Sequence, residues 1–428
     1  MIRYQLGLFP GYPAEGAWDF TGEDTQYLTH GLHPYLASMI PQVARKLLAM
    51  YAQPTTRVLD PFVGGGSVLV ESYLANLLSA GIDINPLAVM ISRAKTTPIP
   101  SEVLTAAWRA FERIYPKTPP DFPDFPASAR IHYWFKPYMF EPLAKIRTAI
   151  GEVAAQVGGE HRESLENLLL CVFSNTVRDV SLTYRGEIRL RRLQGKDLEQ
   201  FNPDVLDEFR LRLRDAFFRV VKLPPANVKP CVYEGDSRHI EAESGAYDLV
   251  ITSPPYGDIK NTIPYDQFSK NMLYWLGMGE AAVNRIRNGA LGAKKDRHRG
   301  IPPSETLHTA VAQIRKPNLL REAMAFYADY YDALTEIARV TSQRIVIVIG
   351  HRILGGVLFD NPTITTELMR EIGWNLEARF ERRIRKKRLN RKMGFGNNAQ
   401  GATIDTEAIL VYTAGWRRLW AVTIASQS

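Results

Sequence analysis

The sequence predicts an α/β protein with a largely parallel, twisted sheet that ends in a β-hairpin and is interrupted by a helical insertion. Residues 56–94 follow the order strand, helix, strand, helix, which is typical of parallel strands joined by helical crossovers. Residues 101–228 contain helical segments near 138–155, 161–180 and 203–222 and no clear strand. Two final strands, 375–384 and 407–413, are joined by a long loop rich in Arg, Lys, Gly and Asn, which indicates a hairpin at one edge of the sheet.

Composition narrows the class of protein before any motif is considered. The chain has 428 residues, enough for two or three domains, and is 45% hydrophobic and 23% charged, as globular proteins usually are. Its net charge of +8 favours a polyanionic partner. The sequence has no apolar run of transmembrane length and no signal-peptide pattern at Met1. We therefore expect a cytoplasmic protein that does not contact a membrane.

The two cysteines, Cys171 and Cys231, are too few and too far apart for a disulfide framework or a zinc site. Cys171 lies in an apolar helical run, and Cys231 begins a predicted strand. The expectation is that the protein requires no metal.

The first part of the chain supplies the predicted β-α-β-α unit. Its elements, in order, are an irregular arm (1–26), a helix (29–51), a strand (56–60), a helix (68–78), a strand (80–84) and a helix that Asn85 and Pro86 open. A proline at the first helical position has a favourable backbone angle and needs no hydrogen-bond partner.

The later part begins with a stiff, proline-rich linker at 115–127. The further expected elements are helices near 138–155, 161–180 and 203–222, strands at 230–236 and 247–251, a helix at about 318–340, a central strand at 344–350 and a helix near 363–372. We divide the chain into a cofactor-motif segment (1–100), a helical insertion that is a candidate target-recognition region (101–228), the catalytic strands and loop (229–280), a basic insertion (281–317) and the C-terminal part of the catalytic domain (318–428).

A glycine-rich turn follows the first strand. The residues Asp60-Pro61-Phe62-Val63-Gly64-Gly65-Gly66 lie between that strand and a helix, and such a turn lets backbone N–H groups approach a nucleotide-like ligand. Asp83 ends the next strand, where a carboxylate can accept ribose hydroxyls. The dinucleotide fingerprint fails because Leu69 occupies its third glycine, and no P-loop lysine follows. A turn needed only for tight strand-to-helix packing remains the alternative.

A second turn, Thr252-Ser253-Pro254-Pro255-Tyr256, follows the buried strand 247–251. Pro254 cannot donate to a sheet ladder, so the strand must end there. The stiff turn presents Ser253 and Tyr256 at the carboxyl end of the strand, where ligands bind in open α/β sheets. The alternative is a Pro-Pro turn that only closes the strand.

These segments resemble motifs of the S-adenosylmethionine-dependent DNA amino-methyltransferases. Residues 60–66 resemble motif I (D-P-F-x-G-x-G), and residues 252–256 resemble motif IV ([D/N/S]-P-P-[Y/F]). Residues 29–35 resemble the segment that closes over the methionine end of the cofactor, and residues 233–236 resemble the motif whose Asp faces the adenine. The resemblance implies a class I, Rossmann-like methyltransferase fold with S-adenosylmethionine as cofactor.

The resemblance also assigns roles to individual positions. The implied cofactor-binding residues are His33, Pro34, Asp60, Pro61, Phe62, Gly64, Gly66, Asp83, Ile84, Asp236 and Ser237, and the implied catalytic residues are Ser253, Pro254, Pro255 and Tyr256.

Methylation of an exocyclic amine needs alignment and hydrogen-bond acceptors rather than a covalent nucleophile. The Oγ atom of Ser253 and the carbonyl beside Pro254 can hold the amino protons, and Tyr256 can stack on a base flipped out of the duplex. Methylation at cytosine C5 would need a nucleophilic cysteine, and neither cysteine lies in a suitable segment. Within the family, Ser before Pro-Pro is commoner in cytosine-N4 enzymes. N6-adenine methylation, RNA guanine-N2 methylation and a non-enzymatic nucleic-acid-binding protein remain the alternatives.

Three basic clusters are candidates for contact with double-stranded DNA, each with a solvated surface as the alternative. The first cluster contains Arg185 and Arg189, the second lies within residues 285–299, and the third is the run 382–392. Residues 257–262 and 265–268 resemble the family's loop near the flipped base. The expected nucleic-acid contacts are Lys260, Arg185, Arg189, Arg382, Arg383, Arg385, Lys386, Lys387 and Arg388. A restriction–modification system would add a cognate restriction endonuclease as a partner.

Overall fold

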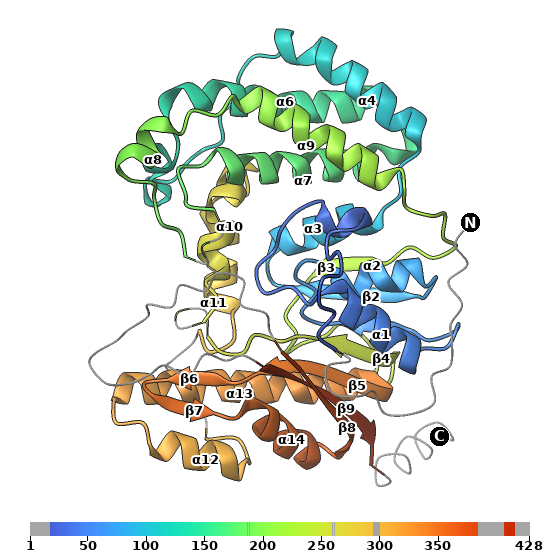
Figure 1. Ribbon diagram of the computed structural model, residues 1–428, viewed down its shortest axis with the longest axis vertical. Coiled ribbons are helices and arrows are strands. Elements are labelled where there is room, and N and C mark those ends of the chain that lie inside the picture. The colour runs from blue at the N-terminus through green and yellow to red at the C-terminus, as the bar shows by residue number, and fades with distance from the viewer. Residues whose placement is uncertain are drawn as a thin grey trace.

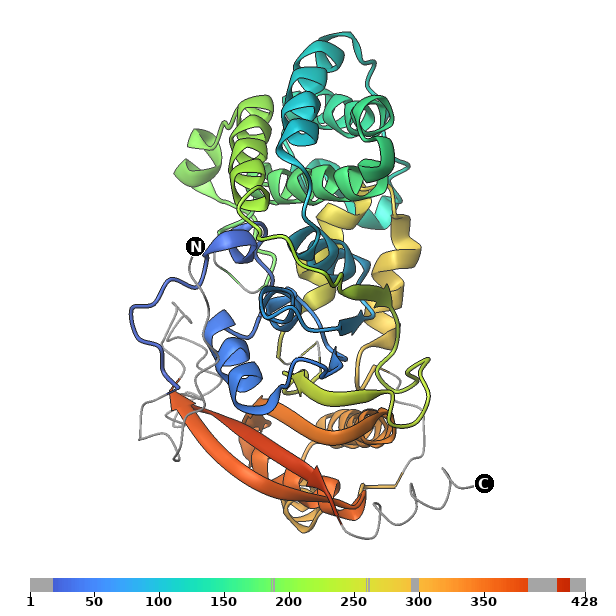
Figure 2. The ribbon, with the colours of Figure 1, turned by 90° about the vertical axis from the view of Figure 1, so that its right-hand side faces the viewer.

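The computed structural model describes residues 18–185, 187, 189–258, 260, 262–293, 300–383 and 406–415. A seven-stranded sheet lies toward one end of the long axis, and a group of helices forms the other end (Figures 1 and 2). The strands of this sheet are β1 (Val58–Asp60), β2 (Ser79–Asp83), β3 (Cys231–Glu234), β4 (Tyr247–Thr252), β5 (Thr341–Gly350), β8 (Trp374–Arg383) and β9 (Thr406–Ala414).

The strand order is β3-β2-β1-β4-β5-β9-β8. The first five strands are parallel, and β9 runs antiparallel to both β5 and β8. The predicted α/β fold, a largely parallel sheet that ends in a β-hairpin, is therefore confirmed. A smaller antiparallel pair, β6 (Arg352–Leu354) and β7 (Val357–Phe359), was not predicted.

The strand order reverses direction between β1 and β4, the two central strands. Val58 pairs with Ser79 of β2 on one side and with Leu249 of β4 on the other. Connections leave in opposite directions from such a point, which opens a crevice at the carboxyl ends of the strands. Asp60, Asp83 and Thr252, the last residues of their strands, therefore meet at one edge.

Both faces of the central strands are covered because their side chains alternate between two hydrophobic layers. Val58 and Val346 pack in the layer that includes Leu47 of α1. Leu59 and Ile345 belong to the opposite layer, which contains residues of α13 and α14. The helices of the sheet-containing part are α1 (Pro41–Tyr51), α2 (Ser67–Leu74), α3 (Pro86–Thr96), α12 (Glu305–Ala312), α13 (Pro317–Val340) and α14 (Asn361–Glu371).

The helical end consists of α4 (Ser101–Ile114), α5 (Ile131–Trp134), α6 (Phe140–Val157), α7 (Arg162–Val180), α8 (Gly195–Gln200) and α9 (Val205–Val220), with α10 (Tyr265–Trp275) and α11 (Gly279–Gly289) joining it to the sheet (Figure 1). Short 3-10 turns are η1 (Leu28–Gly31), η2 (Tyr115–Lys117), η3 (Ala127–Ala129), η4 (Pro137–Met139) and η5 (Gly159–His161).

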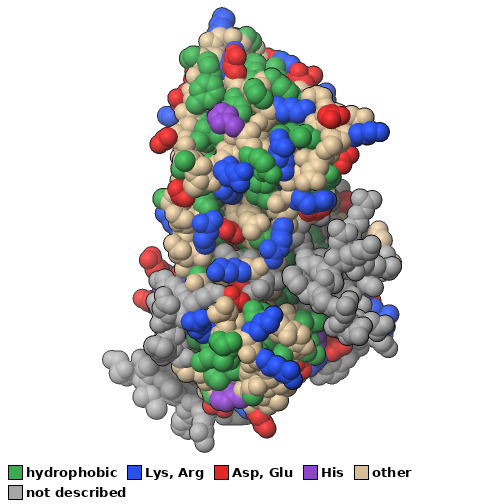
Figure 3. All heavy atoms as spheres, turned by 90° about the vertical axis from the view of Figure 1, so that its left-hand side faces the viewer, with side chains coloured by type: hydrophobic (Ala, Val, Ile, Leu, Met, Phe, Trp, Pro, Cys, Tyr) green, Lys and Arg blue, Asp and Glu red, His purple; other side chains and the backbone are tan. Residues whose placement is uncertain are grey.

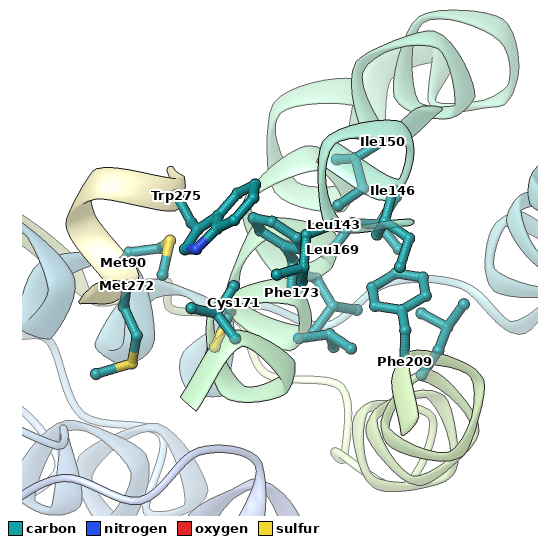
Figure 4. Close-up of a cluster of buried hydrophobic side chains, with 14 of the residues drawn as sticks. Met90, Leu143, Ile146, Ile150, Leu169, Cys171, Phe173, Phe209, Met272 and Trp275 are labelled. Atoms are coloured by element: carbon teal, nitrogen blue, oxygen red, sulfur yellow. The ribbon is translucent and has the colours of Figure 1, made fainter. Parts of the chain in front are cut away.

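The core of the helical end is shared with segments outside it. Trp275 and Met272 of α10 and Met90 of α3 lie beside Cys171 and Leu143 in one buried cluster (Figure 4). Helix α10 also lines the site described below through Tyr265, its first residue, so this cluster connects the helical end to the site. The boundaries proposed for the insertion, 101–228, remain a prediction.

Two sequence predictions about helices were wrong. Residues 29–51 form the turn η1 and then α1, because Pro34 and Pro41 interrupt the helical pattern and Pro41 becomes the first residue of α1. Residues 265–268, expected in the loop near the flipped base, begin α10. Helices α4, α11 and α12 were also missed. Within the described ranges, no helix has the length and apolar character needed to cross a membrane.

Candidate active site

A cavity lies at the carboxyl ends of β1, β2 and β4, the crevice that the strand order predicts. Its walls come from distant parts of the chain. The lining residues are Tyr35, Leu36, Ala37, Ser38, Met39, residues 60–65, Ser67, residues 83–85, residues 235–237, Ser253, Pro255, Gly257, Tyr265, Ile286 and residues 289–291.

The glycine turn is held too tightly for larger side chains. Gly64 and Gly66 have φ values of +47° and +79°, which glycine adopts without strain. A Cβ atom on Gly65 would lie 2.5 Å from Ser38 Oγ. Lys95, which is buried, donates from Nζ to the Gly65 carbonyl at 3.0 Å. The turn thus packs tightly against its neighbours and also forms a wall of the cavity. The interpretation as a ligand-binding turn and the interpretation as a tightly packed turn are therefore compatible.

Asp83 is a buried acid at the end of β2. Its Oδ2 atom accepts from Gly64 N and its Oδ1 atom from Asn85 N, both at 2.9 Å. These amides favour the ionised form, but burial is the larger influence and raises the pKa of Asp83 to about 6. Each carboxylate oxygen can accept a second hydrogen bond, so the group can still receive hydroxyls from a ligand in the cavity.

Asp60 is a second buried acid on the same wall. Its Oδ1 atom accepts from Thr252 Oγ1 at 2.7 Å and from Phe62 N at 3.1 Å. Burial raises its pKa to about 7, and the nearby Asp83 adds to the increase. Two desolvated carboxyls facing one cavity favour a ligand that brings positive charge and hydroxyl donors.

Asn85 connects this wall to α10. Its Nδ2 atom donates to Tyr35 Oη at 2.9 Å and to Ser269 Oγ at 2.8 Å, while its Oδ1 atom caps α3 by accepting from Leu87 N. The Tyr35 ring stacks on Tyr265, with centroids 5.9 Å apart. Sequence reasoning found Asn85 only as a helix start, placed Tyr35 and Tyr265 only within longer segments that resemble family motifs, and missed Ser269.

Asp236, which follows β3, also lines the cavity and is paired with a cation. Arg238 donates to its Oδ2 atom at 2.6 Å and also contacts Asp329 at 2.9 Å. Although burial acts to raise it, the bonds from Arg238 hold the pKa of Asp236 below its usual value. Ser237 lies beside Asp236 in the cavity wall.

The structure disagrees with the sequence on His33 and Pro34. Neither residue lines the cavity, and residues 35–39 line it instead. His33 is buried and its Nδ1 atom lies 2.6 Å from the Pro34 carbonyl. Burial lowers the pKa of His33 to about 3, so the ring is neutral and donates from Nδ1. These residues direct the chain toward the cavity without facing it.

The Ser-Pro-Pro-Tyr turn meets the cavity on one side only. Ser253 and Pro255 line the cavity. The Tyr256 hydroxyl donates to Glu407 Oε1 at 2.8 Å and lies 3.4 Å from Ser253 Oγ. Burial and the nearby Glu407 raise the pKa of Tyr256 well above its usual range, so the phenol keeps its proton. Of the other cofactor-binding and catalytic predictions, Pro61, Phe62, Gly64 and Ile84 line the cavity, whereas Gly66 and Pro254 do not.

The structure brings two of the predicted basic residues together beside this turn. Arg189 donates from Nη2 to the Lys260 carbonyl at 2.6 Å, and both residues are exposed. Arg185 is exposed as well, with its Nε atom 3.9 Å from Asp179. A buried ion pair between Asp258 and Arg352 fixes the start of the loop that carries Lys260.

Arg382 does not fit the expected role of a phosphate contact, because its guanidinium is buried and pairs with Glu407 at 2.8 Å. The backbone N–H of its neighbour Arg383 donates to Asp19 at 2.8 Å. The remaining predicted contacts, Arg385, Lys386, Lys387 and Arg388, lie outside the described residues. In the second basic cluster, Arg285 pairs with Glu234, and Arg287 pairs with Asp266 at 3.3 Å.

The described residues contain no group of three or more His, Cys, Asp or Glu side chains arranged to hold a metal ion. The polar side chains that line the cavity are the carboxyls of Asp60, Asp83 and Asp236, the amide of Asn85, and hydroxyls of serine and tyrosine residues that include Ser253.

Comparison with known proteins gives one full-length relative. No protein-family model matches the chain. The type II methyltransferase M.MvaI of Kocuria varians is 30% identical over 430 aligned positions, which cover 92% of each chain. The type II methyltransferase M.MjaII of Methanocaldococcus jannaschii is 36% identical over 66 residues, which are 15% of this chain and 12% of that protein.

Among solved structures, the rRNA methyltransferase aviRa from Streptomyces viridochromogenes aligns with 95% of this chain and 88% of its own. The sequence identity is 11% and the TM-score is 0.28, too low for this match to bear on the argument. The similarity to M.MvaI extends over 92% of both chains. The chain belongs to the type II methyltransferase family.

Proposed function

We propose that the protein transfers a methyl group from S-adenosylmethionine to the exocyclic N4 amine of a cytosine flipped out of double-stranded DNA. One observation carries this proposal: Thr252 Oγ1 bonds to Asp60 Oδ1 at 2.7 Å, which fixes the Ser-Pro-Pro-Tyr turn against the acidic cavity. A cofactor in that cavity and an amine held by Ser253 would share one edge of the sheet, where β1 and β4 end.

The cavity fits S-adenosylmethionine by the chemistry of its walls. Asp83 would accept the ribose hydroxyls, and the buried Asp60 would face the positively charged methionine portion. Tyr35, Ile84 and Ile286 offer flat and apolar surfaces for the adenine. When bound, the cofactor supplies a methyl group activated by a sulfonium charge.

Ser253 is the residue that we expect to act on the amine. The lone pair of an exocyclic amine is delocalised into its ring, so the amine is a weak nucleophile. An acceptor on the amino protons localises that lone pair on nitrogen, and Ser253 Oγ and the carbonyl beside Pro254 can provide it. Tyr256, a half-buried residue, provides the proposed stacking surface for the base.

A covalent cysteine route has no support from the geometry. Cys171 lies in the helical core (Figure 4), and burial raises its pKa to about 12, so it remains a thiol. Cys231 starts β3 at the edge of the sheet, and neither cysteine lines the cavity. This supports direct transfer to an amine over transfer to cytosine C5.

Three observations support DNA as the substrate. The relative M.MvaI is named a type II methyltransferase, the class associated with restriction–modification systems. Lys and Arg side chains are distributed along the face shown in Figure 3, from the helical end to the part that contains β6 and β7. Arg189 and Lys260 place two exposed cations next to the catalytic turn, where they can contact phosphates.

The test is transfer of tritium from labelled S-adenosylmethionine to DNA, with RNA as the parallel substrate, followed by nucleoside analysis. The proposal predicts label in N4-methylcytosine from DNA, and loss of label with Ser253→Ala. Label in N6-methyladenine would replace the target base, and label in RNA alone would replace the substrate class.

A further inference from the structure

A chain of hydrogen bonds leads from the catalytic turn away from the cavity and ends on the β8–β9 hairpin. Ser253 Oγ lies 3.4 Å from Tyr256 Oη, which donates to Glu407 Oε1 at 2.8 Å. Arg382 donates to Glu407 Oε2, also at 2.8 Å. Arg382 and Glu407 are directly opposite each other on β8 and β9, the long strands that form the hairpin in Figure 2.

The chemistry of the four groups fixes which group donates and which accepts in each of these hydrogen bonds. An ionised carboxylate can only accept hydrogen bonds, and Arg382 can only donate them. Burial keeps Tyr256 protonated, so its single O–H proton is committed to Glu407. Toward Ser253, the phenol oxygen can then only accept a hydrogen bond. The hydroxyl proton of Ser253 is therefore used in the bond to Tyr256 Oη.

We propose that Glu407 is a positioning residue that sets the polarity of this chain and so leaves Ser253 Oγ as an acceptor for the substrate amine. This inference rests on the proposed function, in which Ser253 holds an amino proton. Without the carboxylate, Tyr256 could donate to Ser253 instead. The hydroxyl of Ser253 would then be free to point its own proton at the amine, which is the wrong direction for activating it.

The turn has a second support that does not depend on Glu407. Asn361 Nδ2 donates to the Tyr256 carbonyl at 3.0 Å and to the Gly350 carbonyl at 2.9 Å. Tyr327 Oη in turn donates to Asn361 Oδ1 at 2.6 Å. Because these bonds hold the backbone, removing the charge of Glu407 should reorient hydroxyl protons without releasing the turn.

The competing explanation is that Glu407 only ties the hairpin to the rest of the sheet through Arg382. The two explanations differ in whether the effect of Glu407 passes through the Tyr256 hydroxyl. A double-mutant cycle separates them, because groups that act as one unit are not additive.

The experiment measures kcat with saturating DNA and S-adenosylmethionine for Glu407→Gln, Tyr256→Phe and the double variant. We expect each single variant to lose about 10- to 100-fold in kcat, and the double variant to lose no more than the worse single one. S-adenosylmethionine Kd, measured by calorimetry, should stay within about twofold because neither Tyr256 nor Glu407 lines the cofactor cavity.

Glu377→Gln is the matched control, because Glu377 also pairs with an arginine, Arg344, at 2.8 Å. Glu377 lies near the opposite end of β8 from Arg382, the residue paired with Glu407. It should leave kcat unchanged. Losses that multiply in the double variant would overturn the proposal in favour of the structural explanation.

Tyr256→Phe also tests the proposal alone, because it leaves the Glu407–Arg382 pair intact. A wild-type kcat in that variant would overturn the proposal even if Glu407→Gln failed to fold. Failure of the proposed function gives a different result, namely a wild-type protein that transfers no methyl group to DNA.

Discussion

The two sides of the site are built in different ways. The cofactor side consists mainly of residues 60–67 and 83–85, which come from one β-α-β unit and whose buried acids are held by backbone amides and one hydroxyl. The base side is the turn at 253–256, which is held by residues 361 and 407 from the far end of the chain. Changes on the cofactor side should therefore affect ligand binding, and changes on the base side should affect turnover.

The largest effect is expected on the base side. Tyr256→Ala removes both the proposed stacking surface and the hydroxyl that contacts Glu407, so turnover should fall by at least about 100-fold, as for loss of a preorganised active-site contact. S-adenosylmethionine affinity should stay within a few fold. Steady-state kinetics with calorimetry checks both, and near-normal turnover would remove Tyr256 from the site.

On the cofactor side, Asp83→Ala should weaken S-adenosylmethionine binding by more than about tenfold, roughly 1.4 kcal/mol, because a charged hydrogen-bond acceptor is lost. Calorimetry measures the change in Kd. An unchanged affinity would mean that the ribose does not lie on Asp83.

The pH dependence should also distinguish the two sides. Burial raises the pKa of Asp83 to about 6 and that of Asp60 to about 7. At low pH both acids are protonated, so Asp83 accepts ribose hydroxyls poorly and Asp60 no longer attracts the positively charged methionine portion. Cofactor affinity should rise as the pH increases through this range, by several fold. Calorimetric titrations between about pH 5 and about pH 8, on the order of one unit beyond each pKa, check this, and a flat profile would contradict it.

The same acids should influence the stability of the free protein with the opposite sign. Their folded-state pKa values lie above the ordinary value of 3.8, so the native state holds protons more tightly than the unfolded state does. Their contribution to stability is full at low pH and is lost as the pH rises toward 7. Asp60→Asn, whose Oδ1 atom can still accept from Thr252 and Phe62, should therefore raise the Tm of the free protein above pH 7, by on the order of 2 °C, while weakening cofactor binding. A lower Tm would contradict this.

The smallest effect should come from Asp236, the third acid of the cavity. Arg238 already occupies its carboxylate with bonds of 2.6–3.1 Å, so the group has less capacity for a ligand than Asp83. Asp236→Asn should change S-adenosylmethionine affinity by no more than about threefold. A loss equal to that of Asp83→Ala would show that the pairing with Arg238 gives way when the ligand binds.

The cofactor side was largely predictable because its signals are local. A buried strand followed by a glycine turn, and a second strand that ends in an acid, identify Asp60, Gly64 and Asp83 from fewer than 30 consecutive residues. The parallel order of β1 and β2 then brings those residues together, as the alternation of strands and helices predicts.

The base side was predictable only in the turn itself. The contact between Tyr256 and Glu407 joins residues 151 positions apart, and nothing near either residue indicates it. Arg382 was misassigned because a run of charges conceals the alternation of a strand. Phe380 and Arg382 share the inward face of β8, whereas Glu381 and Arg383 point outward.

The most direct test is a crystal structure of the protein with S-adenosylhomocysteine, the product that remains after methyl transfer. The account predicts ribose hydroxyls on the Asp83 carboxylate, the adenine between Tyr35 and Ile286, and the sulfur atom at the end of the cavity that Ser253 lines. A ligand bound outside this cavity, or a Ser253 hydroxyl that faces away from the sulfur, would contradict the account.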